Sequence, residues 1–355
     1  MTVNYTFDTH YKTLSENYNT QNETNLTLAR VMAQYKGMYL IATEEKTMNA
    51  VISGKMRFDA IYPQDMPAVG DFVMADDSDD TTAVIHCILE RKTTFIRKAA
   101  GTSANSQLIA TNVDTVFICM SLGEDFNIRR LERYLSVMNQ SGSESVIVLT
   151  KADTAEDLNF RLSELSHISK KYPVVISSAY DETGFDELKK YIRPGKTIAF
   201  TGSSGVGKST LINKLLGEDI QKTNGLRDDE KGRHTTTTRE IFSLPDGAYL
   251  IDTPGMREMG MWTDSQGLEE VFSDIEELIS SCRFSDCSHT VEKGCAIIGA
   301  IKSGELDKTR WDNYLRLNKE ISYARNSEDY LAKKEQWRKD ISKRNKAMKK
   351  NKNRY

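Results

Sequence analysis

One segment of this chain has the residue types and spacing of a phosphate-binding loop. Residues 202–209 read Gly-Ser-Ser-Gly-Val-Gly-Lys-Ser and fit the P-loop pattern G-x-x-x-x-G-K-[ST]. The glycines would let successive backbone N–H groups face a phosphate, Lys208 would reach the β- and γ-phosphates, and the Ser209 hydroxyl would bind Mg²⁺. An apolar run precedes the motif and an amphipathic stretch follows it, which favours phosphate binding over a chance glycine-rich turn. The predicted phosphate-binding residues are Gly202, Ser203, Ser204, Gly205, Val206, Gly207, Lys208, Ser209 and Thr210.

A second motif could recognise guanine. The run Thr150-Lys151-Ala152-Asp153 follows an apolar segment, and the Asp153 carboxylate could accept from both N1–H and the 2-amino group of guanine. Adenine lacks that pair of donors, so the motif predicts GTP and argues against an ATP-using enzyme. The stem of Lys151 would lie along the base, and the Thr150 hydroxyl would take over part of the bracing role of the usual Asn. The dipeptide Ser178-Ala179 would add a backbone N–H near guanine O6, although alone it carries no information.

Two further segments supply candidates for Mg²⁺ binding and catalysis. Asp252 ends an apolar run and could hold Mg²⁺ through water, and the Gly255 N–H could approach the γ-phosphate, with a simple Asp-Thr-Pro-Gly turn as the alternative. In the threonine-rich stretch before it, Thr236 would complete the Mg²⁺ shell. Met256 stands where Ras-like enzymes carry a water-orienting Gln. We therefore expect slow intrinsic hydrolysis, with His234 either orienting the water or facing solvent as an ordinary loop residue.

The order of these motifs along the chain is rotated. In an ordinary GTPase the guanine-reading segments follow the P-loop, whereas residues 150–153 and 178–179 precede it here and residues 252–255 follow it. Ligands of open α/β sheets bind beyond the carboxyl ends of the strands. Moving the chain termini to another loop would leave such a site intact, so the sequence predicts a circularly permuted GTP site.

Three cysteines and one histidine form a separate cluster with metal-ligand spacing. The pattern Cys282-x4-Cys287-x-His289-x5-Cys295 suits one tetrahedral Zn²⁺ ion, and four protein ligands would leave no open position for catalysis. A structural zinc site is therefore predicted, with unmetallated buried cysteines as the alternative. The remaining cysteines, Cys87 and Cys119, lie singly in apolar runs and are expected to be buried core thiols.

The segments that must position these residues show two different hydrophobic patterns. Short alternating segments between residues 28 and 98 predict a five-stranded, OB-like barrel, with strands at 30–33, 38–42, 50–55, 71–74 and 83–90. Apolar runs at 115–120, 145–149, 174–176, 197–200 and 248–251 alternate with amphipathic stretches, which predicts an α/β domain with a parallel sheet. The first 25 or so residues are polar and predict an irregular or partly helical lead-in. Helical segments follow residue 265.

Composition limits the class of protein. At 355 residues, with 39% hydrophobic and 28% charged residues, the chain is long enough for two or three domains. No apolar stretch would span a membrane and no signal peptide is read, so a cytoplasmic protein without membrane contact is expected. The net charge of −3 divides into +9 for residues 331–355 and −12 for the rest. That basic tail could contact RNA or form a solvated helix, and both interpretations stay open.

Taken together, these motifs resemble the RsgA family of circularly permuted GTPases. The resemblance extends from about residue 30 to residue 320, and includes 107–114, 125–131, 133–135, the GTP motifs, 232–237 and the Cys/His cluster. Family members have a hydrophobic residue in place of the catalytic Gln and a histidine in the switch loop, which Met256 and His234 match. The long polar amino terminus and the extended basic tail depart from the family pattern.

The resemblance implies a domain plan and a function. The implied plan is a polar extension (1–27), an OB-fold RNA-binding domain (28–100), a permuted GTPase domain (101–264), a helical zinc domain (265–330) and a basic tail (331–355). The implied function is that of a monomeric GTP hydrolase that binds 16S rRNA in the 30S ribosomal subunit and acts late in its assembly. Ribosome-stimulated hydrolysis of GTP to GDP would drive its release. The alternative is a GTP-dependent binding or signalling module with a non-ribosomal partner.

Overall fold

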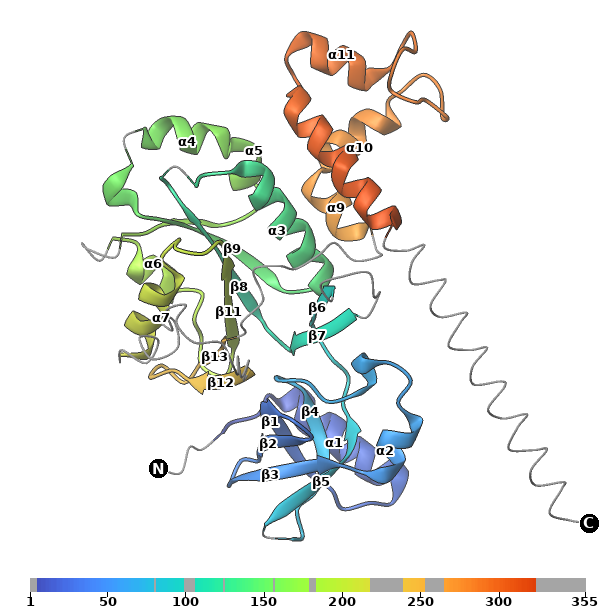
Figure 1. The fold of residues 1–355 in the computed structure, drawn as a ribbon, viewed down its shortest axis with the longest axis vertical. Coiled ribbons are helices and arrows are strands. Elements are labelled where there is room, and N and C mark those ends of the chain that lie inside the picture. Colours follow the sequence, from blue (N-terminus) through green and yellow to red (C-terminus); the bar gives the residue numbers. More distant parts are fainter. Residues whose placement is uncertain are drawn as a thin grey trace, which may run out of the picture. The chain divides into compact units, whose positions relative to one another are not determined.

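The structure is a computed structural model that describes residues 5–79, 81–98, 106–123, 125–155, 157–178, 183–217, 239–252 and 265–323. The chain divides into two compact units (Figure 1). One comprises residues 1–97 and 106–260, and the other comprises residues 98–105 and 261–355. The first unit contains a barrel and an α/β domain, and the second contains the Cys/His cluster.

The barrel of the first unit has five strands: β1 (Thr27–Tyr35), β2 (Met38–Ala42), β3 (Thr47–Ile52), β4 (Phe72–Asp76) and β5 (Thr82–Ile88). They are hydrogen-bonded in the order β1-β2-β3-β5-β4, and β4 pairs back onto β1, which closes the barrel. Only β3 and β5 run parallel. Helix α2 (Gly54–Asp59) and the short helix η1 (Pro63–Asp65) connect β3 to β4. The predicted OB-like barrel is confirmed, since alternating residues such as Val31, Ile41 and Ile85 fill its core.

The polar amino-terminal segment contains helix α1 (Thr9–Asn22), which begins after the N-cap residue Asp8. The helix is polar on nearly all sides, and Tyr11 is its one buried residue. The Tyr11 ring stacks on Phe72 of β4, and its hydroxyl donates to Asn112 Oδ1 at 2.9 Å. The extension is therefore partly helical, and Tyr11 makes the buried contact of the helix, while Lys12 pairs with Glu44 at 2.8 Å on the surface.

The α/β domain is built on β8 (Thr115–Ser121), β9 (Glu144–Thr150), β10 (Val174–Ile176), β11 (Thr197–Gly202), β12 (Arg239–Ser243) and β13 (Tyr249–Asp252). Their order is β10-β9-β8-β11-β13-β12, in which the first five are parallel and β12 is antiparallel to β13. The helices are α3 (Ile128–Ser141), α4 (Leu158–Glu164), α5 (Ser166–Ser169), α6 (Phe185–Lys189) and α7 (Lys208–Leu216), with the short helix η2 (Ala152–Thr154). The predicted parallel α/β sheet is confirmed.

Barrel and α/β domain share one sheet of eleven strands. Strand β12 pairs antiparallel with β1, with Ala33 opposite Glu240 and Gln34 opposite Arg239. A separate two-stranded sheet of β6 (Thr94–Lys98) and β7 (Ser106–Thr111) lies in the chain between the barrel and β8. The sequence predicted neither this small sheet nor strand β12.

A buried arginine also joins barrel and α/β domain. Arg30 of β1 is 3% exposed, and its Nη2 donates to Thr197 Oγ1 at the start of β11 at 2.7 Å. Its guanidinium lies over the rings of Phe72 and Tyr249, 5.0 and 5.2 Å from their centroids. Burial lowers the pKa of Arg30. Tyr5 stacks on the same Tyr249 ring. We call these contacts, together with those of Tyr11, the base junction, because they lie at the end of β11 opposite to the P-loop.

The described part of the second unit, residues 265–323, is mainly helical, as predicted. It contains α9 (Gln266–Val271), α10 (Ser273–Ser280), α11 (Ala296–Ser303) and a helix over residues 308–323. Arg310 of the last helix forms an ion pair with Asp274 of α10 at 2.8 Å. Phe272, Leu317 and Ile321 are buried between these helices.

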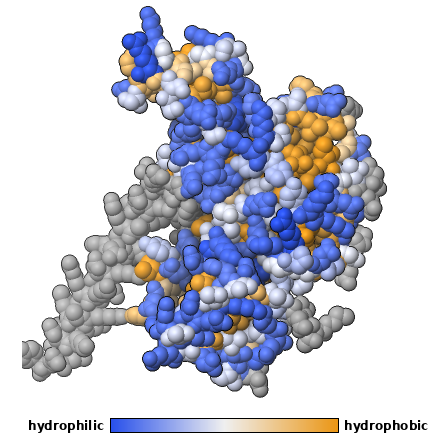
Figure 2. Space-filling view, turned by 180° about the vertical axis from the view of Figure 1, so that it is seen from behind, coloured by the Kyte–Doolittle hydropathy of each residue, from blue (hydrophilic) through white to orange (hydrophobic). Residues whose placement is uncertain are grey.

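Hydrophilic residues cover most of the described surface on the face shown in Figure 2. This agrees with a composition that is 28% charged. In the part of the chain that the structure describes, no helix is both long enough and apolar enough to cross a membrane.

Candidate functional site

The predicted nucleotide motifs lie at one edge of the α/β sheet. Strands β9, β11 and β13 end at Thr150, Gly202 and Asp252, and each motif begins at the carboxyl end of its strand. Strands β8 and β11 are neighbours, but the chain leaves β8 towards β9 and β10 and leaves β11 towards β13 on the other side. This is a topological switch point, where open α/β sheets bind their ligands.

The P-loop turns sharply from β11 into α7 because its glycines allow it. Gly202 has φ of 135°, and a Cβ atom there would lie 2.2 Å from the carbonyl oxygen of Cys119. Gly205 and Gly207 also have positive φ, and α7 begins directly afterwards at Lys208. The Lys208 Nζ donates to the carbonyl oxygens of Gly202, at 2.6 Å, and Ser203. The lysine thus folds over the loop that precedes it, with Ser209 and Thr210 in the first turn of the helix.

The guanine-type motif touches the P-loop through Thr150. Its buried hydroxyl donates to the carbonyl oxygen of Val206 at 2.5 Å, across 56 residues of chain. It also lies 3.3 Å from the carbonyl oxygen of Met120 at the end of β8. The hydroxyl that stands in the place of the usual Asn therefore braces the end of β9 against the P-loop.

The segment at residue 178 adjoins the same motif. Ser178 Oγ donates to Asp153 Oδ1 at 2.9 Å, and the Ala152 backbone N–H donates to the Ser177 carbonyl oxygen at 3.3 Å. Lys151 has a left-handed backbone with φ of 58°, and both Lys151 and Asp153 are exposed. Segments that precede the P-loop in sequence therefore lie beside it in space.

Several predicted site residues lie outside the described residues. These are Ala179, His234, Thr236 and Gly255. Asp252 is the last residue of β13, which places its backbone at the nucleotide edge of the sheet, but its side chain is not described.

Sequence reasoning assigned no role to Arg130, which also reaches the P-loop. This residue lies in the first turn of α3, and its Nη1 contacts Ser203 Oγ and both carboxylate oxygens of Asp125. The sequence does contain one indication of this role: Arg130 is a basic residue at the amino end of α3, the helix that follows the central strand β8.

The Cys/His cluster of the second unit has the dimensions of a tetrahedral metal site. The four ligand atoms of Cys282, Cys287, His289 and Cys295 lie within 4.8 Å of one another. Cys282 Sγ is 3.9 Å from Cys295 Sγ, and both sulfurs are 3.5 Å from His289 Nδ1. Metal–sulfur and metal–nitrogen bonds of about 2.3 and 2.0 Å at a tetrahedral angle give edges of about 3.8 and 3.5 Å. The residues therefore fit a metal ion.

The surroundings of the cluster act differently on its thiols, since burial raises the pKa of Cys287 to about 11 whereas the pKa of Cys282 is lowered. Burial raises the pKa of the Cys282 thiol, but hydrogen bonds from the backbone N–H groups of Ala296 and Ile297 outweigh it and lower that pKa. These donors belong to the amino end of α11, where N–H groups have no partner within the helix. The His289 ring packs edge-on against Trp311 at 5.5 Å, which fixes its orientation.

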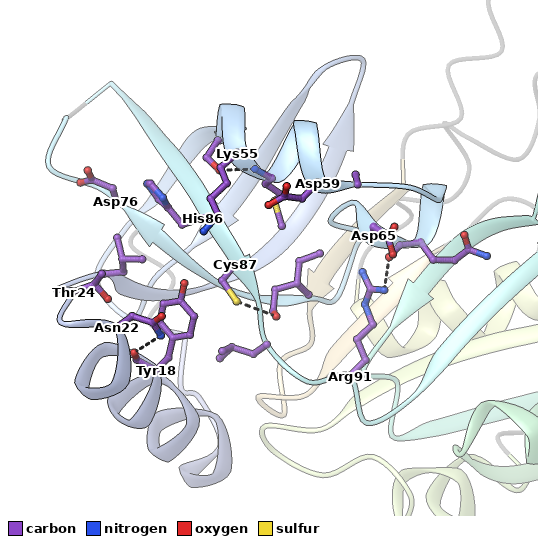
Figure 3. A pocket seen from close by; sticks show the side chains of 17 residues that line it. Tyr18, Asn22, Thr24, Lys55, Asp59, Asp65, Asp76, His86, Cys87 and Arg91 are labelled. Atoms are coloured by element: carbon purple, nitrogen blue, oxygen red, sulfur yellow. Dashed lines mark hydrogen bonds between the residues drawn. The ribbon is translucent and has the colours of Figure 1, made fainter. Parts of the chain in front are cut away.

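A groove of about 800 Å³ with both polar and apolar lining residues lies on the barrel (Figure 3). Side chains of α1, α2 and β5 line it, among them Tyr18, Lys55, Asp59 and His86. Cys87 also lines this groove and is partly exposed, so the expectation of a buried core thiol is wrong for Cys87 and confirmed for Cys119. Cys87 follows the exposed His86 near the end of β5, where the register against β4 shifts, so the apolar run around it was not enough to place its side chain.

The permuted strand order and the P-loop at the switch point define a circularly permuted P-loop GTPase with an OB-like barrel. Residues 88–262 match the family model described as RsgA GTPase. The chain is 45% identical over 297 residues to the small ribosomal subunit biogenesis GTPase RsgA 2 of Lactiplantibacillus plantarum, covering 83% of this chain and 84% of that protein. It is 44% identical over 314 residues to RsgA of Methanosarcina acetivorans, covering 84% of each.

A solved structure agrees with these matches. The crystal structure of YjeQ from Thermotoga maritima superposes with a TM-score of 0.64 at 26% identity, covering 84% of this chain and 99% of that one. The chain belongs to the RsgA GTPase family.

Proposed function

We propose that this GTPase acts in the late assembly of the 30S ribosomal subunit, and that the subunit stimulates GTP hydrolysis and thereby causes release. The observation that carries the proposal is the contact of Thr150 with Val206, which joins a guanine-type motif to a P-loop in permuted order. The relatives named for small ribosomal subunit biogenesis support the ribosomal part.

The nucleotide would lie across the switch point between β8 and β11. Asp153 would accept from guanine, and the P-loop N–H groups with Lys208 would surround the phosphates. To reach a phosphate, Lys208 exchanges its contacts with the carbonyl oxygens of Gly202 and Ser203 for phosphate oxygens. The proposed GTP-binding residues are Thr150, Lys151, Ala152, Asp153, Ser178, Ala179, Gly202, Ser203, Ser204, Gly205, Val206, Gly207, Lys208, Ser209, Thr210 and Gly255.

Ser209, Thr236 and Asp252 are the proposed magnesium-binding residues. Bound Mg²⁺ would neutralise charge on the β- and γ-phosphate oxygens. His234 would orient a water for attack on the γ-phosphorus, and the bond to the β-phosphate oxygen would break to leave GDP and phosphate. Lys208 would stabilise the charge that develops on that bridging oxygen.

For the Cys/His cluster we propose one structural Zn²⁺ ion, because four protein ligands leave no open position. Metal analysis of the purified protein should give about one zinc per chain. A chelator should lower the helix content of the second unit, because the ion holds the loop of residues 282–295 together. Retention of the full helix signal after complete removal of zinc would contradict a structural role.

The ribosomal partner is proposed to be the 30S subunit, with 16S rRNA contacted by the barrel and the basic tail. The protein would act as a cytoplasmic monomer. The proposed domain boundaries are those implied by the family resemblance: 1–27, 28–100, 101–264, 265–330 and 331–355.

GTP turnover measured with and without 30S subunits tests this function. Slow hydrolysis by the protein alone and much faster hydrolysis with 30S subunits, but not with 50S subunits, are expected. His234→Ala should lose the stimulated rate while still binding GTP. Hydrolysis that 30S subunits do not change would remove the ribosomal part of the proposal and favour a GTP-dependent module with another partner.

A further inference from the structure

The loop after β8 is held firmly beside the P-loop. Its described residues, 122–123 and 125–127, lie between β8 and α3 at the switch point. The Leu122 backbone N–H donates to the Thr150 carbonyl oxygen at 2.9 Å, and Arg161 of α4 donates to the Gly123 carbonyl oxygen at 2.7 Å. The guanidinium of Arg161 also lies 5.2 Å from the ring centroid of Phe126. The loop therefore offers a fixed support at the place where the nucleotide edge is open to ligands.

Arg130 projects from this support onto the P-loop. Its Nη1 contacts Ser203 Oγ and forms an ion pair with Asp125 at 2.8 and 2.9 Å. The backbone N–H of Arg130 donates to the N-cap side chain of Asn127 at 3.1 Å, so the start of the side chain is anchored as well. One helical turn further, the hydroxyl of the buried Tyr134 hydrogen-bonds the same Ser203. Two side chains at positions i and i+4 of α3 thus converge on one P-loop residue.

The place of Arg130 in its helix is electrostatically unfavourable. A cation in the first turn of a helix faces the positive end of the helix dipole, and the first turn of α3 contains no acidic residue to compensate. Asp125, just outside the helix, supplies the missing negative charge. Arg130 thus lies in an unfavourable first turn, is neutralised by Asp125 and contacts the neighbouring P-loop. This combination indicates that Arg130 has a role in the P-loop.

We propose that Arg130, held by Asp125, positions the P-loop for nucleotide binding through its contact with Ser203. This inference rests on the proposed function of the P-loop. The contacts of Lys208 with residues 202 and 203 are given up when the lysine turns to a phosphate. The contact from Arg130 does not depend on Lys208, so it can keep Ser203 in place while the nucleotide is bound. Arg130 is therefore a positioning residue for both GTP and GDP, which need the same arrangement of P-loop N–H groups.

Binding of fluorescent mant-GDP, combined with GTP turnover by the full chain, tests this role. Arg130→Ala should weaken mant-GDP binding and raise the KM for GTP about 10-fold, the loss of one charge-assisted hydrogen bond, with kcat changed less than about twofold. Ser203→Ala should weaken binding at least as much, because it removes the contacts with both Arg130 and Tyr134. The double variant should bind no more weakly than Ser203→Ala alone, because that variant already lacks the contact with Arg130. Arg130→Lys should restore only part of the affinity, since an ammonium group lacks the planar fork.

The neighbouring Arg129→Ala is the matched control, because Arg129 is an exposed arginine of the same helical turn. It should bind mant-GDP like the wild type. Melting temperatures of all variants separate positioning from folding. An Arg130→Ala variant that melts earlier but binds with wild-type affinity would overturn the inference, and so would single effects that multiply in the double variant. Wild-type protein that binds neither nucleotide would overturn the proposed function as well, whereas normal wild-type binding with unaffected variants overturns this inference alone.

Discussion

The two ends of strand β11 are built in different ways. At its amino end, the base junction packs a guanidinium and aromatic rings into the interior, with Arg30 3% and Tyr11 2% exposed. At its carboxyl end, the P-loop meets Thr150 and Arg130 through single polar contacts, and Lys151 and Asp153 are exposed. Both ends join segments that are far apart in sequence, but stacked rings make the contacts at the base, whereas hydrogen bonds make them at the P-loop.

This difference assigns separate tasks to the two ends. Contacts made by burying apolar surface and rings stabilise the fold and resist rearrangement. Polar contacts at an exposed edge can be exchanged for contacts with a ligand at little cost. Changes at the base junction should therefore lower stability, and changes at the nucleotide edge should lower affinity or rate.

The largest effect is expected for Arg30→Ala. It removes the hydrogen bond to Thr197 and the stacking on two rings, and leaves a cavity, so the free energy of unfolding should fall by about 3–4 kcal/mol. Urea unfolding followed by circular dichroism measures this change. The exposed Arg57→Ala is the control and should stay within about 0.5 kcal/mol of wild type. A loss below about 1 kcal/mol for Arg30→Ala would mean that the base junction contributes little.

Lys208→Ala should lower enzymatic activity and leave the stability of the fold unchanged, the opposite of Arg30→Ala. We expect kcat/KM for GTP to fall about 100-fold or more, which is about 2.7 kcal/mol, with unchanged urea stability. Lys190→Ala, which removes an exposed lysine paired with Glu187, is the control for the loss of a positive charge. Unchanged turnover in Lys208→Ala would exclude this P-loop from the reaction.

Thr150→Val tests a single contact at the nucleotide edge. The valine keeps the shape but cannot donate to Val206, so mant-GDP should bind about 5- to 10-fold more weakly, the equivalent of about 1 kcal/mol. Thr150→Ser should restore much of the affinity, because it keeps the hydroxyl. If valine and serine variants bind equally, the hydroxyl does not brace the loop.

The smallest effect is expected at the rim of the base junction, where Asp8 pairs with Lys92 at 3.0 Å. The backbone N–H of His10, and then Lys92, lower the pKa of Asp8. A carboxyl with a lowered pKa stabilises the fold above its unfolded pKa of about 3.9, and this contribution is lost as the pH falls through the folded pKa. Because the pair is exposed, Asp8→Asn should cost less than about 0.5 kcal/mol at pH 7. The cost, from urea unfolding at several pH values, should vanish in acid, and a cost that persists there would point to another cause.

Much of the molecule could be predicted because its signals are local. The strands of both domains have alternating or continuous apolar residues, and the P-loop and the Thr150–Asp153 motif are contiguous. The amphipathic stretch between β9 and β10 forms two helices, α4 and α5, which are divided at Leu165. Arg30 and Arg130 could not be given a role from sequence, because their partners Thr197 and Ser203 lie 167 and 73 residues away. The packing of α1 was missed because Tyr11 is the one buried residue of the helix, which leaves no apolar periodicity to signal it.

The base junction also determines the order in which parts of the chain can fold during synthesis. The barrel strands are complete by residue 88, but the ring of Tyr249 that covers Arg30 lies at the far end of the α/β domain. At about 5–20 residues per second, translation from residue 88 to residue 249 takes roughly 8–30 s. During that interval the nascent barrel presents its guanidinium and aromatic surface to whatever surrounds it at the ribosome exit.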